Sequence, residues 1–106
     1  MSKTEMSFLD NPDLEKIRVA SQSNRLRILN HLLKNEKMYA SKIGDMLGME
    51  RKAIAFHLNT LEQVGLVKSE FGLTEVEKGK RPATAKYYKL TPKGKEIFER
   101  IVHMLK

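Results

Sequence analysis

The feature that most constrains the fold is a pair of short apolar patterns that predict two helices joined by a turn of only three residues. The first pattern spans residues 40 to 47 at helical spacing, and Gly48 follows where glycine commonly ends a helix. The second begins at Ile54, after Gly48-Met49-Glu50, and closes at Gly65. Two helices joined by so short a turn must cross steeply, and the second keeps a polar face exposed. The sequence therefore predicts a helix-turn-helix.

Further elements are predicted on both sides of this pair. Helical spacing indicates helices over about residues 12 to 20 and 24 to 34, followed by a polar turn at 35 to 37. Alternating residues after Gly65 indicate two strands joined by a basic turn at 78 to 82, and Gly72 predicts a bulge or a change of face in the first strand. Thr91-Pro92 caps a last helix, 92 to 105. We expect an α+β, mainly α fold with about five helices and a two-stranded hairpin.

Length and charge limit the possible functions. A chain of 106 residues has room for one core, which argues against a multidomain enzyme. Twenty Lys and Arg against thirteen Asp and Glu give a net charge of +7, which favours an anionic partner, nucleic acid first and a membrane surface second. Residues 78 to 95 hold seven basic side chains and no acidic one. Because no membrane-length apolar run or signal peptide is evident, we expect a cytoplasmic protein without a membrane partner.

Residues for enzymatic or metal chemistry are scarce. The sequence has no cysteine and three scattered histidines, so we expect no metal site and no cofactor. His57 lacks a histidine or carboxylate four residues further on, which favours a packed or hydrogen-bonded side chain over a metal ligand. Neither a Ser/His/Asp set, an acidic pair nor a Gly-rich phosphate loop stands out. We therefore predict that the protein is not an enzyme.

Three segments resemble the ArsR-type (arsenic-repressor-like) regulators. Residues 23 to 29 resemble the family's Arg-x-x-Ile-Leu opening, 55 to 67 are similar to its recognition helix, and 79 to 91 look like the wing and Tyr-x-Leu-Thr ending of prokaryotic winged-helix repressors. The resemblance covers roughly 12 to 104 and implies a winged helix-turn-helix that binds double-stranded DNA sequence-specifically, as a dimeric repressor. Two departures are Glu50, where the family has Ser or Asp, and Ala55, which replaces a serine that often faces DNA.

The resemblance also assigns candidate DNA-binding residues. The first turn of the recognition helix enters the major groove, where Arg or Lys can donate to guanine O6 and N7. Phe56 could instead contact a thymine methyl group or belong to the core, and Asn59 could read adenine or be merely solvated. Major-groove candidates are Arg51, Lys52, Ala55, Phe56 and Asn59; phosphate candidates are Ser41 and Lys42; the wing carries Lys78, Lys80 and Arg81.

The terminal helix has a wide apolar stripe that predicts a second interface. It exceeds what a small core should need, so we expect homodimerisation through Leu14, Ile17, Ile97, Phe98, Ile101, Val102 and Leu105. A two-fold dimer would read a pseudo-palindromic operator. We expect residues 1 to 10 to be a flexible arm and 11 to 106 the DNA-binding domain, with dimerisation helix 92 to 105. The alternative is a protein-interaction, basal-transcription or RNA-binding module on the same fold. Nothing in the sequence identifies an effector ligand.

Overall fold

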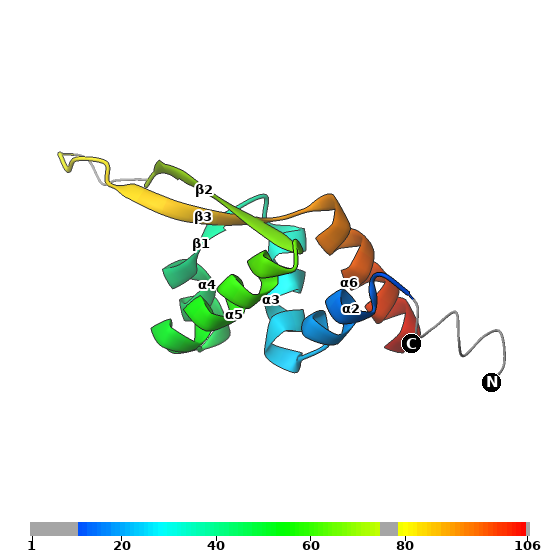
Figure 1. Cartoon of the computed structure of the whole chain (residues 1–106). Helices are drawn as coiled ribbons and strands as arrows, with labels where there is room; N and C mark the ends of the chain where they lie inside the picture. The colour runs from blue at the N-terminus through cyan, green and yellow to red at the C-terminus, as the bar shows by residue number, and fades with distance from the viewer. Residues whose placement is uncertain (1–10, 75–78, 106) are drawn as a thin grey trace, which may run out of the picture.

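Five helices and three strands make up the part of the chain that the computed structural model describes, residues 11–74 and 79–105 (Figure 1). In chain order they are α2 (Leu14–Ala20), α3 (Ser23–Lys34), β1 (Met38–Tyr39), α4 (Ala40–Leu47), α5 (Arg51–Gln63), β2 (Val67–Leu73), β3 (Thr84–Leu90) and α6 (Pro92–Leu105). The predicted mainly α, winged fold is confirmed. The predicted arm at residues 1 to 10 and the wing residue Lys78 lie outside the described residues.

The helix-turn-helix forms where the sequence predicts it, between α4 and α5. Gly48 adopts a left-handed conformation with φ of 67°, which a side chain would disfavour. The amide of Met49 donates to the carbonyl of Gly44 at 2.9 Å, which closes the end of α4. Apolar residues of α3, α4 and α5 then fill one core, among them Ile28, Leu29, Ile43, Ile54, Leu58 and Leu61. The turn therefore fixes how α5 lies against the rest of the domain.

The sheet has three antiparallel strands in the order β1-β3-β2, so the prediction of two strands missed one. β1 arises because Met38 enters the core beside Tyr88, with which it pairs. The bulge or change of face predicted at Gly72 is wrong, since β2 and β3 pair residue by residue without a break from Val67↔Leu90 to Leu73↔Thr84. A Cβ at Gly72 would lie 3.1 Å from the Tyr87 ring, so the glycine makes room for an aromatic side chain.

The start of α6 is fixed to the turn between α5 and β2. The Thr91 hydroxyl accepts from the amide of Gly94 at 2.9 Å and donates to the carbonyl of Gly65 at 2.7 Å. The predicted cap is therefore confirmed, and it also connects two elements that are distant in the sequence. Gly94 lies so close to this turn that a Cβ there would come within 1.9 Å of the Leu66 carbonyl oxygen.

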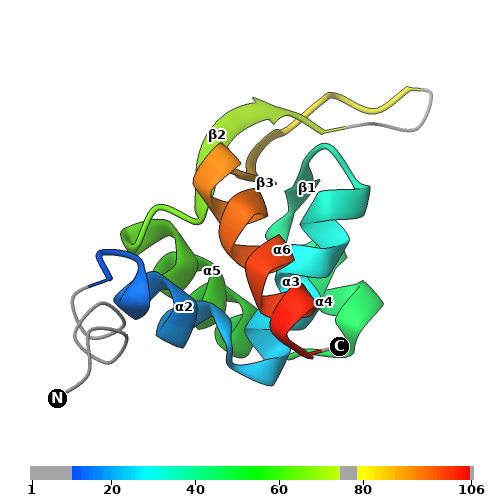
Figure 2. The same cartoon turned by 90° about the vertical axis from the view of Figure 1, so that its right-hand side faces the viewer.

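Helices α2 and α6 lie side by side at the end of the molecule opposite the wing (Figures 1 and 2). Asp13, just before α2, forms ion pairs with two α6 side chains, with Lys93 at 3.4 Å and with Arg100 at 3.1 Å. These pairs hold the first described residues against the terminal helix. They also leave Asp13 mostly buried between the two helices, with its side chain 16% exposed.

The apolar stripe of α6 requires a correction. Ile97, Phe98 and Ile101 are buried in the protomer's own core, so the expectation that they face a partner is wrong for these three side chains. The core buries more residues of this stripe than we expected for so small a domain, because α6 packs on both α2 and α3. Leu14, Ile17 and Val102 are half-buried, and Leu105 is 73% exposed beside Met104 at 63%. These five remain accessible at the α2–α6 end.

Candidate nucleic-acid interface

Helix α5 presents a continuous exposed face. Ile54, Leu58 and Leu61 are buried on its inner side, which turns Lys52, Ala55, Phe56 and Asn59 outward, with Arg51 exposed at its start. Phe56 is 61% exposed, so of its two predicted locations the structure places it outside the core. Gln63 continues this face one turn beyond Asn59 and was missed, because nothing in its local sequence separates it from an ordinary solvated residue.

Helix α4 brings two more candidates to the start of the helix-turn-helix. Ser41 and Lys42 are exposed in its first turn, where backbone N–H groups lack helical partners. The other end of α4 is fixed by Arg27 of α3, whose Nη2 donates to the carbonyl of Leu47 at 2.8 Å. Helix α3 therefore supports both the orientation of α4 and, through the core, that of α5.

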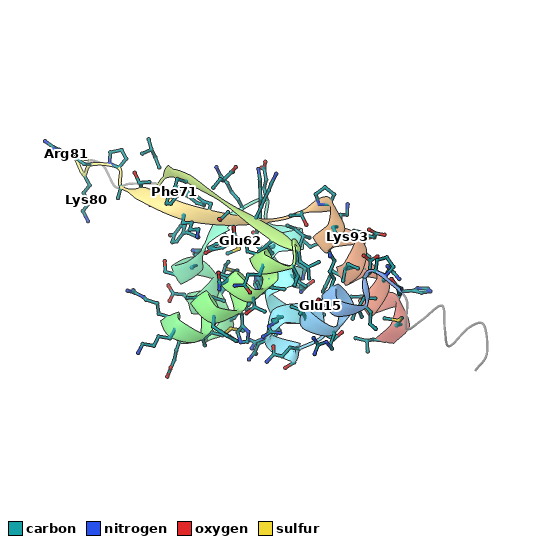
Figure 3. The ribbon with its side chains drawn as sticks, viewed as in Figure 1. Glu15, Glu62, Phe71, Lys80, Arg81 and Lys93 are labelled. Atoms are coloured by element: carbon teal, nitrogen blue, oxygen red, sulfur yellow. The ribbon has the colours of Figure 1, made fainter. Side chains whose placement is uncertain are left out.

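The wing carries exposed basic side chains at its tip. Lys80 and Arg81 lie at the far end of the hairpin, well away from the helices (Figure 3). Below the tip, Thr74 and Ala83 form a backbone hydrogen bond of 2.8 Å, and the Tyr87 hydroxyl donates to the carbonyl of Leu73 at 2.9 Å. The described part of the hairpin is thus regularly bonded almost to its basic end.

Two apolar residues on β2 were not anticipated. Phe71 is 75% exposed and Leu73 68% exposed, both on the same face of the hairpin (Figure 3 labels Phe71). Their cross-strand neighbours are Lys86 and Thr84. The alternating pattern indicated a strand here but not which of its residues are exposed, and β2 runs beyond the helices that would cover these two side chains. The wing therefore has an apolar flank as well as a basic tip.

His57 is held inside the domain by an arginine of α3. Arg25 Nε donates to His57 Nδ1 at 3.2 Å, and the His57 side chain is 9% exposed. Burial, and secondly the nearby Arg25 charge, lower the pKa of His57 below its usual value of 6.5. The imidazole is therefore neutral near pH 7 with Nδ1 as the acceptor. The prediction of a packed, hydrogen-bonded histidine is confirmed.

The described part of the chain brings together neither metal ligands nor a membrane span. Within residues 11–74 and 79–105, no three His, Asp or Glu side chains gather in a way that could hold a metal ion. No helix in these ranges is long and apolar enough to cross a membrane.

A helix-turn-helix followed by a basic hairpin and a terminal helix defines the winged helix-turn-helix class. A profile of the family described as "Bacterial regulatory protein, arsR family" matches residues 22–69, from the start of α3 into β2. The helix-turn-helix segment of this chain is therefore similar to the arsR family, which confirms the resemblance seen in the sequence. No curated protein matches the chain.

Solved structures share the fold over most of the chain. A transcriptional regulator homologue from Pyrococcus horikoshii OT3 is 26% identical, with 88% of this chain and 89% of that one covered and a TM-score of 0.70. HlyU from Vibrio cholerae is 23% identical, covering 99% and 97%, with a TM-score of 0.64. The homodimeric winged helix-turn-helix DNA-binding domain of a possible ArsR-family regulator from Mycobacterium bovis is 20% identical, covering 99% and 87%, with a TM-score of 0.68. The family and fold are those of transcriptional regulators.

Proposed function

We propose that this chain is a cytoplasmic, homodimeric regulator that binds a pseudo-palindromic DNA operator and represses transcription by occupying it. The observation that carries the proposal is the outer face of α5, where Arg51 and Lys52 stand in the first turn and Phe56 and Asn59 follow. A helix with basic, aromatic and amide groups on one exposed face matches the donors and apolar contacts that read base edges in the major groove.

The wing and α4 complement this face. Lys80 and Arg81 at the hairpin tip, with Ser41 and Lys42 on α4, are candidates for backbone phosphates or the minor groove. Such contacts position the protein on the duplex but carry little sequence information. Sequence discrimination is therefore expected from α5, and general affinity from the wing and α4.

The exposed apolar residues of the α2–α6 end support dimerisation there. Leu105 and Met104 are exposed on α6, and Leu14 and Ile17 of α2 are only half-buried. The similar Mycobacterium bovis domain is described as homodimeric. A two-fold dimer would place its recognition helices about 34–36 Å apart, so we expect inverted half-sites with centres roughly 10 base pairs apart.

Selection of bound sites from random duplex DNA tests the DNA-binding proposal. We expect enrichment of one inverted repeat with the half-site spacing given above. Single-stranded RNA of random sequence serves as the competitor. If RNA competes as well as the selected duplex, or if no sequence is enriched, the protein-interaction or RNA-binding interpretation replaces this one.

Sedimentation at tens of micromolar tests the dimer. Leu105→Glu places a charge on the exposed end of α6 and should shift the protein toward the monomer without unfolding it. Lys34→Glu is the control, because it changes an exposed residue at the end of α3. A wild-type protein that sediments as a monomer would contradict the dimer, as would a Leu105→Glu variant that stays dimeric.

A further inference from the structure

Arg25 is the arginine of the Arg-x-x-Ile-Leu segment seen in the sequence, and it lies near the α5 face, but the DNA contacts proposed above do not include it. It lies in the first turn of α3, yet its guanidinium reaches two other helices. Nε donates to His57 Nδ1 on α5 at 3.2 Å, and Nη1 donates to the carbonyl of Val19 on α2 at 3.1 Å. The guanidinium carbon also lies 5.8 Å from the centroid of the Phe56 ring. One side chain therefore joins α2, α3 and α5.

These contacts fix the guanidinium but do not neutralise it. Its partners are a neutral imidazole, a carbonyl oxygen and an aromatic ring. No carboxylate in residues 11–74 or 79–105 forms an ion pair with it. A partly buried positive charge without an acidic partner attracts an anion more strongly than a solvated one does.

Hydrogen-bond donors also remain for such an anion. A guanidinium has five N–H donors, and two of them are used by His57 and Val19, which leaves three. Both N–H groups of Nη2 belong to this remainder, with no partner in the described part of the chain. Since the rest of the group is already held in place, binding an oxyanion through Nη2 would immobilise little further side-chain freedom.

The location of Phe56 indicates which anion is within reach. Its ring is 61% exposed on the α5 face proposed to enter the major groove, and the Arg25 guanidinium lies against this ring. A group at the flank of a helix in the groove faces the sugar-phosphate backbone that borders it. We infer that Arg25 binds a DNA backbone phosphate beside the recognition helix, with His57, Val19 and Phe56 holding its guanidinium in place.

The test rests on the proposed DNA binding and measures the salt dependence of affinity. Removing one phosphate contact lowers the slope of log K against log salt by about 0.9, hence by about two per dimer. Arg25→Gln removes the charge but keeps an amide that can donate to His57. As the salt concentration rises from 50 to 200 mM, the ratio of wild-type to variant DNA affinity should fall by about twelvefold. This fall should be the same on operator and random duplex.

Lys34→Ala is the matched control, because it removes one exposed positive charge from the same helix. It lies nine residues further on, about 14 Å along the axis. Its slope should equal that of the wild type. An Arg25→Gln slope equal to that of Lys34→Ala would overturn the inference, and a fall in operator preference at unchanged slope would make Arg25 a positioning residue for Phe56 instead.

A measurement on the unaltered protein covers the case in which Arg25→Gln unfolds. The Arg25 Nε–H signal in a proton–nitrogen NMR spectrum can be identified by its proximity to the His57 ring. Added duplex should shift the Arg25 side-chain signals, and unshifted signals in a saturated complex would overturn the inference. A wild-type protein that binds no duplex would show that the proposed function itself fails, which is distinct from either result.

Discussion

The substitution Gly94→Ala tests most directly how closely α6 packs on the turn between α5 and β2. A Cβ at this position would lie 1.9 Å from the Leu66 carbonyl oxygen, whereas ordinary contact begins at 3.4 Å, so α6 would have to retreat by about 1.5 Å. That shift would weaken the bonds from the Thr91 hydroxyl to the Gly65 carbonyl and from the Thr91 amide to the Leu66 carbonyl.

The expected cost of Gly94→Ala follows from these contacts. Overpacking costs about 1–3 kcal/mol and the two weakened hydrogen bonds about 1 kcal/mol each, while alanine regains about 1 kcal/mol of helix propensity. The free energy of unfolding should therefore fall by about 2–4 kcal/mol, which lowers Tm on the order of 10–20 °C for a domain of this size.

Thermal and urea unfolding followed by circular dichroism measure this loss. Lys95→Ala, at the exposed neighbouring position of α6, is the control and should change stability by no more than about 0.5 kcal/mol. The sign of the Gly94→Ala effect is decisive, because alanine in an uncrowded helix stabilises it. A variant as stable as the wild type, or more stable, would refute the close packing of α6 on the Gly65–Leu66 turn.

Three further predictions concern the turn, the histidine and metals. Gly48→Ala should destabilise by about 1–2 kcal/mol in urea unfolding, since nothing crowds its Cβ but φ is 67°; an unchanged midpoint would contradict this. Because the pKa of folded His57 is lowered, stability should be unaffected at pH 7, fall as the pH drops below the unfolded value of 6.5, and level off below the folded pKa. His57→Gln should flatten this pH dependence, and an equal dependence in both proteins would exclude His57 as its source. Stoichiometric zinc should leave a DNA complex intact in a gel-shift titration, because the described residues do not bring four ligands together; release would contradict this.

Local signals predicted the helices and their ends well. Gly48 marks the end of α4, and Thr91-Pro92 marks the start of α6, because caps and left-handed glycines depend on nearby residues. β1 could not be predicted in this way, since two residues have no period and Met38 becomes a strand only by pairing with Tyr88. Gly72 was misread for a similar reason, as the Tyr87 ring that requires it comes from the opposite strand.

In the candidate site, too, features that depend on local sequence could be predicted and features that depend on long-range contacts could not. The exposed face of α5 follows from helical spacing, so Lys52, Ala55 and Asn59 could be placed on it from the sequence, whereas the spacing left Phe56 between this face and the core. The location of the Arg25 guanidinium beside this face could not be predicted, because its hydrogen bond to His57 joins residues that are 32 positions apart in the sequence. Nor does the apolar stripe of α6 reveal which residues its own core buries, because the burial of Ile101 depends on how α2 and α3 pack against it.

The central claim is that α5 reads DNA sequence while the wing adds affinity for any duplex. Arg51→Ala and Arg81→Ala test it most directly when each is titrated against the selected operator and a random duplex across a salt series. Arg81→Ala should weaken both complexes and lower the salt slope by about two per dimer. Arg51→Ala should mainly reduce the difference in binding free energy, here called the gap, between operator and random DNA, by about 1–3 kcal/mol per base contact. If Arg81→Ala leaves affinity and slope unchanged, or Arg51→Ala leaves the gap intact, the proposed division of roles between α5 and the wing is wrong.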